Sequence, residues 1–195
     1  MNDLHSTLAY LQSTETQLLA QAREMDLNYR PPDGGWSAGQ VLAHLIRTEK
    51  FMYPMFVTAL KLLPSQTVLN VLDRVNVVMS KLAGIGFISN GEKLPQNLDD
   101  LNPNFKGRFV APAFLRPAKK HHELASLMTA REKIRIRTLR VIRNAPADRL
   151  TTLKFSHPVL GKFTLLEFVL FLGKHEEWHT AQLNRIKNQY RESNS

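Results

Sequence analysis

The C-terminal stretch of residues 164–190 decides the fold, and it reads TLLEFVLFLGKHEEWHTAQLNRIKNQY. Its apolar positions recur at steps of three and four residues, which is the period of one face of an α-helix. Thr164 with Glu167 forms a capping box at its start. The stretch therefore predicts a long amphipathic helix over 165–190. Its core stripe consists of Leu165, Phe168, Leu172, His175, His179, Leu183, Ile186 and Tyr190.

Two histidines occupy positions of this stripe where leucines are expected. His175 and His179 lie on adjacent turns, so their Cβ atoms are about 5–6 Å apart. Both imidazoles can then reach one metal ion through bonds of about 2.0–2.1 Å. A lone core histidine is usually just a hydrogen-bonded residue, but two neighbouring imidazoles are hard to satisfy without an ion. The spacing therefore favours a metal site over a pair of structural histidines.

Residues 175–179 also fit the pattern H-E-x-x-H of zinc peptidases. Such peptidases take a third ligand downstream, whereas Glu192 is the only carboxylate after His179 and no further histidine follows. The third ligand must therefore come from upstream. Glu176 directly follows a ligand, so it is a candidate general base or a residue that orients a ligand, with a solvated helix surface as the alternative.

His44 is the best candidate for the third ligand. It lies in a second predicted helix, over 38–60, which starts at a capping box of Ser37 and Gln40 and which Pro54 is expected to kink or end. Facing helices of a bundle build metal sites from inward side chains. The other histidines, which are terminal, beside lysines or in a turn, compete poorly: His5, His121, His122 and His157.

The remaining chain also indicates an all-α fold in a single domain, residues 1–195. A first helix over 3–28 ends before the breakers of residues 30–35, and a basic helix covers about 120–144. The segment 61–118 lies between the two halves of the bundle as an insertion, with an extra helix over 65–83 and an irregular, proline-containing stretch over 91–117. Residues 153–163 flank His157 and form either a short hairpin or an irregular loop.

The basic helix carries most of the formal net charge of +9. On a helical wheel Lys133, Arg137 and their neighbours point outward, whereas Arg131 and Arg135 project among the apolar residues. Buried guanidinium groups need partners, so these two either pair with internal carboxylates, which is the favoured interpretation, or receive a substrate carboxylate. An anion- or nucleic-acid-binding module that uses the basic helix 119–143 is an alternative. No aromatic residues interleave with the cations, so nucleic acid is not favoured.

The composition excludes several classes of site. The chain has 195 residues and no cysteine, so it can form no disulfide, iron–sulfur cluster, thiolate zinc site or cysteine nucleophile. Its N-terminus lacks the features of a signal peptide, and no segment approaches the roughly 20 apolar residues of a membrane span. We therefore expect a soluble, cytoplasmic protein with no membrane partner.

Three segments, read in order, resemble the DinB-like superfamily, in particular its YfiT-type branch. They are WSAGQVLAHL (36–45), HPVLGKFT (157–164) and KHEEWHTAQL (174–183). The resemblance implies a four-helix bundle of up-down-down-up type that holds a divalent ion, often nickel or zinc, on His44, His175 and His179. It also implies a thiol-dependent transferase or isomerase or a metal-dependent hydrolase. Segment 61–118 exceeds the minimal family pattern.

Two functions follow from a three-histidine site. The first is a metal-dependent enzyme that acts on a small-molecule substrate, either as a hydrolase or as a transferase that uses an external low-molecular-weight thiol, because the chain supplies no cysteine. The second is a non-catalytic protein in which the ion staples two helices together. The sequence leaves the oligomeric state open, and a homodimer is one expectation.

Overall fold

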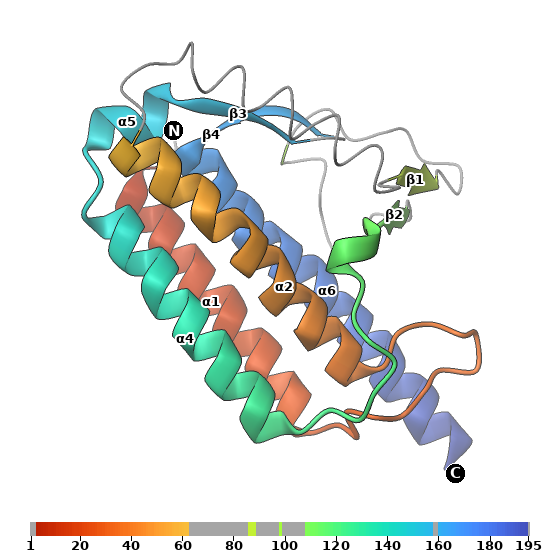
Figure 1. Ribbon diagram of the computed structural model, residues 1–195. Helices are drawn as coiled ribbons and strands as arrows, with labels where there is room; N and C mark the ends of the chain where they lie inside the picture. The colour runs from red at the N-terminus through yellow and green to blue at the C-terminus, as the bar shows by residue number, and fades with distance from the viewer. Residues whose placement is uncertain (1–2, 63–85, 89–97, 99–107, 158–159, 195) are drawn as a thin grey trace.

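The computed structural model describes residues 3–62, 86–88, 98, 108–157 and 160–194, and its main feature is a bundle of four long helices (Figure 1). α1 and α6 run in one direction through the bundle, and α2 and α4 run in the other (Figure 1). This order confirms the predicted all-α, up-down-down-up bundle. The helices are α1 (Leu4–Arg23), α2 (Ala38–Val57), α4 (Leu124–Arg143) and α6 (Leu165–Ser193).

The helix bounds differ from the predicted ones where local chemistry intervenes. α1 stops at Arg23 instead of continuing to residue 28. The Asp26 carboxylate accepts the backbone N–H of Asn28 at 2.9 Å, a local bond that competes with helical bonding. α2 continues past Pro54 to Val57 and then into a π-helical turn, Thr58–Leu62. Pro54 removes one helical hydrogen bond only about a turn from the end, so α2 tolerates it.

Shorter elements connect the long helices. α5 (Ala147–Thr152) leads into an antiparallel hairpin of β3 (Lys154–His157) and β4 (Gly161–Thr164), so the hairpin is the correct one of the two predicted forms. Within the insertion, β1 (Gly86–Ile88) pairs with β2 (Arg108–Val110). The helix predicted over 65–83 lies outside the described residues. No helix among the described residues has the length and apolar character that crossing a membrane requires.

Two capping boxes fix where α2 and α6 begin. The Ser37 hydroxyl accepts the N–H of Gln40 at 3.3 Å, and the Gln40 side chain accepts the N–H of Ser37 at 3.1 Å. Thr164 and Glu167 form the same reciprocal pair at the start of α6. Each cap stabilises its helix by about 1 kcal/mol. Both boxes were predicted from the sequence, and they set the positions of the histidines that follow.

The apolar core is divided into two clusters along the bundle. One cluster contains the residues toward the hairpin, with Leu11, Met52, Ile142 and Leu172 from the four helices. The other contains Leu18, Leu45 and Leu183, with Leu127 of α4 packed against it. The two sets are separated by about two turns along α1 and α2 and by about three turns along α4 and α6. Most of the buried side chains on those turns are polar.

A layer of charged residues lies between the two clusters. Arg131 and Arg135 of α4 are each 4% exposed, and carboxylates from the other three helices surround them. The Arg135 guanidinium donates to the Glu49 carboxylate at 3.0 and 3.1 Å, and the Arg131 Nε donates to Glu15 at 3.0 Å. Both arginines also donate to Oε1 of Glu176. We call Glu15, Glu49, Arg131, Arg135 and Glu176 the charged layer.

The charged layer joins all four helices. Glu15 lies on α1, Glu49 on α2 and Glu176 on α6. The hydroxyl of Thr14 on α1 donates to Oε2 of Glu176 at 2.8 Å, so both oxygens of this carboxylate are engaged. Arg131 and Arg135 thus form the internal ion pairs that the sequence favours over the binding of a substrate carboxylate. The layer fixes the register of α4 against its neighbours, because a shift of any helix would leave a buried charge unpaired.

α6 lies very close to α1 one turn above the charged layer. A Cβ atom at Gly173 would lie 2.7 Å from the Tyr10 ring, so only glycine fits there without a shift. The Tyr10 hydroxyl donates to Glu177 at 2.7 Å beside this contact. The close approach and the hydrogen bond hold the stretch of α6 that carries the histidines against α1.

Replacement of Arg135 by methionine tests the charged layer. Arg135→Met removes the Arg135 hydrogen bonds to the buried Glu49 carboxylate, and we expect a loss of about 3–5 kcal/mol in the free energy of unfolding. Arg137→Met is the matched control, because Arg137 is exposed on the same helix and its replacement should cost less than about 0.5 kcal/mol. Denaturant unfolding measures both values. Equal losses in the two variants would contradict the role assigned to the layer.

Candidate metal centre

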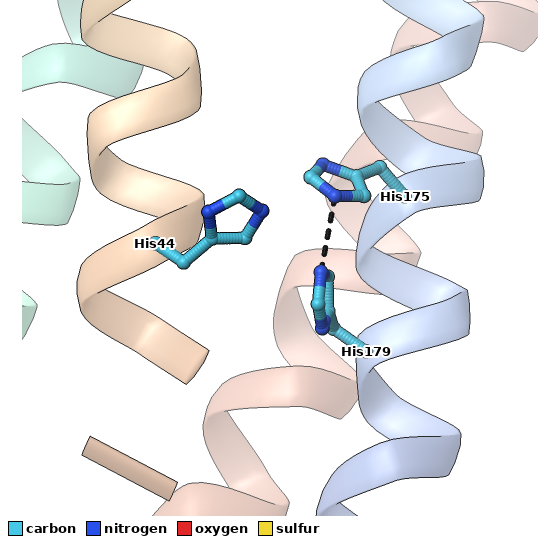
Figure 2. Close-up of side chains that lie close together, drawn as sticks. All are labelled: His44, His175 and His179. Atoms are coloured by element: carbon cyan, nitrogen blue, oxygen red, sulfur yellow. Dashed lines mark hydrogen bonds between the residues drawn. The ribbon is translucent and has the colours of Figure 1, made fainter. Parts of the chain in front are cut away.

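The structure brings together the three histidines that the sequence predicts as metal ligands. One ring nitrogen from each of His44, His175 and His179 lies within 4.8 Å of the other two. Figure 2 shows His44 on α2 facing the pair on α6. His44 and His179 are buried, and His175 is partly exposed. Among the described residues this is the only group of three or more potential metal ligands with this geometry.

The ring nitrogens of the α6 pair face each other. Nε2 of His175 lies 3.0 Å from Nε2 of His179, as the dashed line in Figure 2 indicates. The His44 ring centroid is 5.3 Å from that of His175 and 5.2 Å from that of His179. Two nitrogens at 3.0 Å can share one ion through bonds of about 2.0–2.1 Å. The donor set of three imidazoles suits zinc, nickel or another first-row divalent ion.

Hydrogen bonds on the far side of two rings direct the remaining nitrogens toward the cluster. Nδ1 of His44 lies 3.0 Å from the Leu115 carbonyl oxygen, which can only accept a hydrogen bond. Nδ1 of His179 lies 2.8 Å from Oε1 of Gln182, which likewise accepts. These partners assign the proton of each neutral ring to Nδ1, and the lone pair of each Nε2 is left for an ion. Partners of this kind accompany most metal-binding histidines.

Burial keeps the three imidazoles neutral, which is the form that binds metal. Desolvation lowers the pKa of His44, and it lowers the pKa of His179 to about 3. The pKa of His175 lies well below its usual range because of desolvation and the nearby rings of His179 and His44. The site therefore holds three neutral nitrogen donors at neutral pH.

A segment that we call the strap, residues 111–123, lies along α2 and supplies the partner of His44. Three side chains of α2, spaced by four and three residues, contact strap carbonyls. Besides His44, the Gln40 side chain donates to the Ala118 carbonyl at 3.4 Å, and the Arg47 guanidinium donates to the Arg116 carbonyl at 2.7 Å. Asn28 exchanges two hydrogen bonds with the backbone of His122 at the end of the strap. The strap is therefore held by several contacts, and its Leu115 carbonyl is fixed relative to His44.

Aromatic rings flank the three histidines. The Phe171 ring stacks on His175 with centroids 5.4 Å apart and an angle of 12°. Trp36, which precedes the α2 cap, lies 4.9 Å from the His44 ring. The ring centroid of His157 in the hairpin lies 5.1 Å from that of Phe171. These rings surround the imidazoles with apolar surface and reduce their contact with water.

The other residues predicted for the site lie in the charged layer. Glu176 is 1% exposed, and its carboxylate points to Arg131, Arg135 and Thr14. Both arginines are held by Glu15 and Glu49 as well. The layer is thus linked to the histidine cluster through the backbone of α6, because Glu176 directly follows His175.

Several contributors to the site were missed from the sequence. The Leu115 carbonyl carries no side-chain signal, and it is 71 residues from His44 along the chain. Gln182 has a weak signal, since it lies three residues after His179 on the same helix. Glu49 has a clear signal in the sequence. It lies four residues after Leu45 and three before Met52, so it interrupts the apolar stripe of α2 with a carboxylate.

Comparison with known proteins agrees with the family that the sequence resembles. No curated protein and no solved structure matches the chain. A family model, that of the DinB superfamily, matches residues 8–183. The match extends from α1 to the part of α6 that follows His179, and it includes all three histidines. The chain therefore belongs to the DinB superfamily.

Proposed function

We propose that this protein binds a divalent metal ion through His44, His175 and His179 and acts as a metal-dependent enzyme on a small molecule. The observation that carries the proposal is the convergence of three neutral imidazoles, two of which are oriented by hydrogen bonds on their far side. Three protein ligands leave coordination positions open for water or substrate, as in catalytic sites.

The proposed chemistry is hydrolysis or the transfer of an external thiol. A divalent ion in this site would lower the pKa of a bound water or hold a thiolate for attack on an electrophile. The chain contains no cysteine, so any thiol must come from a second small molecule. The aromatic rings of Trp36 and Phe171 beside the imidazoles favour substrates with an apolar part.

The chain's own residues contribute orientation and charge balance. We assign Glu176 a positioning role, because Arg131, Arg135 and Thr14 already occupy both of its oxygens. These contacts hold the turn of α6 that carries His175 and His179. The same contacts favour assigning Arg131 and Arg135 to this support and not to the binding of a substrate carboxylate.

A non-catalytic metal staple is the second candidate function. It is favoured by the origin of the ligands, since His44 comes from α2 and the other two come from α6. An ion bound there would join two helices and stabilise the fold even if no reaction occurs. Both candidates require the same metal site, so metal binding is tested first and turnover second.

Replacement of a ligand should abolish stoichiometric metal binding. We expect elemental analysis to find about one ion per chain in the wild-type protein and a much lower content in His175→Ala/His179→Ala. His121→Ala is the control, because His121 is exposed and distant from the cluster in the sequence. Equal metal content in the ligand variant and the wild type would refute the site.

Removal of the ion should also lower thermal stability. A ligand that binds only the folded state stabilises it by about 2.7 kcal/mol at a free concentration of a hundred times its Kd. We therefore expect a chelator to lower the Tm of the wild-type protein and to leave the Tm of His175→Ala/His179→Ala unchanged. Identical melting curves of the wild type with and without chelator would count against both candidate functions.

Loss of the Gln182 side chain should weaken metal binding without removing a ligand. Gln182→Ala leaves Nδ1 of His179 without its partner, and we expect the affinity for the ion to fall about 10- to 100-fold. Asn184→Ala, an exposed change two residues further along α6, should leave the affinity within about twofold. Competition with a chelator of known affinity measures both. Equal affinities for the two variants would show that Gln182 does not orient the ligand.

Turnover separates the enzyme from the staple. We expect the zinc- or nickel-loaded protein to accelerate either hydrolysis of esters and amides or transfer of low-molecular-weight thiols to electrophiles, and His179→Ala to lose this activity. Steady-state rates over panels of both substrate types provide the measurement. If the metal-loaded protein accelerates neither reaction, the result contradicts the enzyme and favours the non-catalytic metal staple.

A further inference from the structure

A groove of about 720 Å³ lies on the side of α2 that faces α4. The histidine cluster lies on the side that faces α6. On α2 the groove is lined by Lys50, which follows His44 by six residues and so lies about 120° away around the helix axis. Figure 1 shows α2 with α4 on one side and α6 on the other. The groove and the histidine cluster are therefore separate features.

Short side chains on α4 leave the groove open. Ala125 and Thr129 are four residues apart on one row of the helix, and Ser126 and Ala130 are four apart on the next. Longer side chains at these positions would fill the space between α2 and α4. Ile134 is buried and forms an apolar part of the lining.

Cations line both walls of the groove. Lys50 comes from α2, and Lys133 and Arg137 come from α4 at a spacing of one turn. None of the three forms an ion pair with a residue that the structure describes, whereas Arg131 and Arg135 of the same helix form ion pairs with carboxylates inside the bundle. The lining contains no carboxylate. Three hydroxyl donors complete it, those of Tyr53, Ser126 and Thr129.

We propose that this groove binds a small oligoanion, a molecule with two or more phosphate or carboxylate groups. Its volume falls within the roughly 300–1,000 Å³ of small-molecule sites. Cations on opposite walls suit a ligand with at least two separated anionic groups. The guanidinium of Arg137 can grip a phosphate or carboxylate in a bidentate manner, and the hydroxyls can donate to the remaining oxygens. This proposal goes beyond the metal-dependent function and does not depend on it.

Nucleic acid fits the groove less well than a small molecule. Tyr53 is the only aromatic residue in the lining, whereas single-strand binding uses several aromatic platforms. A polynucleotide would also contact the exposed Arg140 and Arg143, which lie outside the groove on the same helix. The two ligand classes therefore predict different effects of replacing those two arginines.

Direct titration tests the proposal with three probes: tripolyphosphate, propane-1,2,3-tricarboxylate and a single-stranded DNA oligonucleotide. We expect saturable binding of one or both small anions to the wild-type chain by calorimetry. The groove variant Lys133→Gln/Arg137→Gln should weaken it at least tenfold, because each charged hydrogen-bond donor contributes a factor of about ten or more. Preference between the two small anions distinguishes a phosphate ligand from a carboxylate ligand.

Two matched variants make the result specific. Arg140→Gln/Arg143→Gln removes the same charge from the same helix outside the groove, and it should change the affinity by less than about threefold. Both small anions also chelate metal ions, so their titration is repeated on His175→Ala/His179→Ala, where the affinity should be unchanged. All of the replaced α4 residues are exposed, and unchanged melting curves verify that the variants fold.

Any of three results with the small anions would overturn the proposal. The first is the absence of saturable binding at low ionic strength. The second is an equal loss of affinity in Lys133→Gln/Arg137→Gln and in Arg140→Gln/Arg143→Gln. The third is a loss of affinity confined to His175→Ala/His179→Ala. DNA binding that exceeds that of both small anions and depends on Arg140 and Arg143 would also overturn it in favour of a polynucleotide. Failure of the chain to bind metal would refute the proposed function but leave this test unaffected.

Discussion

The guanidinium groups of Arg131 and Arg135 are stable in the middle of the bundle only because carboxylates from the other three helices surround them. This requirement fixes α4 against α1 through Glu15, against α2 through Glu49 and against α6 through Glu176. The charged layer replaces apolar packing at the level where the two core clusters separate. The bundle can therefore adopt only the register in which every buried charge finds its partner.

The histidine cluster depends on that register. His175 immediately precedes Glu176, and His179 follows it by three residues, so the contacts that hold the Glu176 carboxylate also place both imidazoles. On α2, the capping box at Ser37 sets where the helix begins, and the Leu115 carbonyl of the strap sets the orientation of His44. Elements that are distant in sequence thus converge on three neutral nitrogen donors. The groove between α2 and α4 lies apart from the three histidines, and its cations form no ion pair with a described residue because they face outward.

Much of the fold was predictable because its signals are local. Helical periodicity, two capping boxes and the histidines in the stripe of α6 all lie within a few residues of one another. The inward direction of Arg131 and Arg135 also followed from periodicity. Their pairing with Glu15 and Glu49 did not, because pairing across helices depends on packing that no single segment encodes. The Leu115 carbonyl was beyond prediction, since backbone atoms carry no residue signal.

Anomalous diffraction from crystals of the metal-loaded protein, recorded at the absorption edge of the ion, tests the central claim most directly. The account predicts one strong peak about 2.0–2.1 Å from Nε2 of each of His44, His175 and His179. It also predicts that Nδ1 of His44 keeps its hydrogen bond to Leu115. A peak bound elsewhere on the chain, or bound by only one of the three histidines, would contradict it.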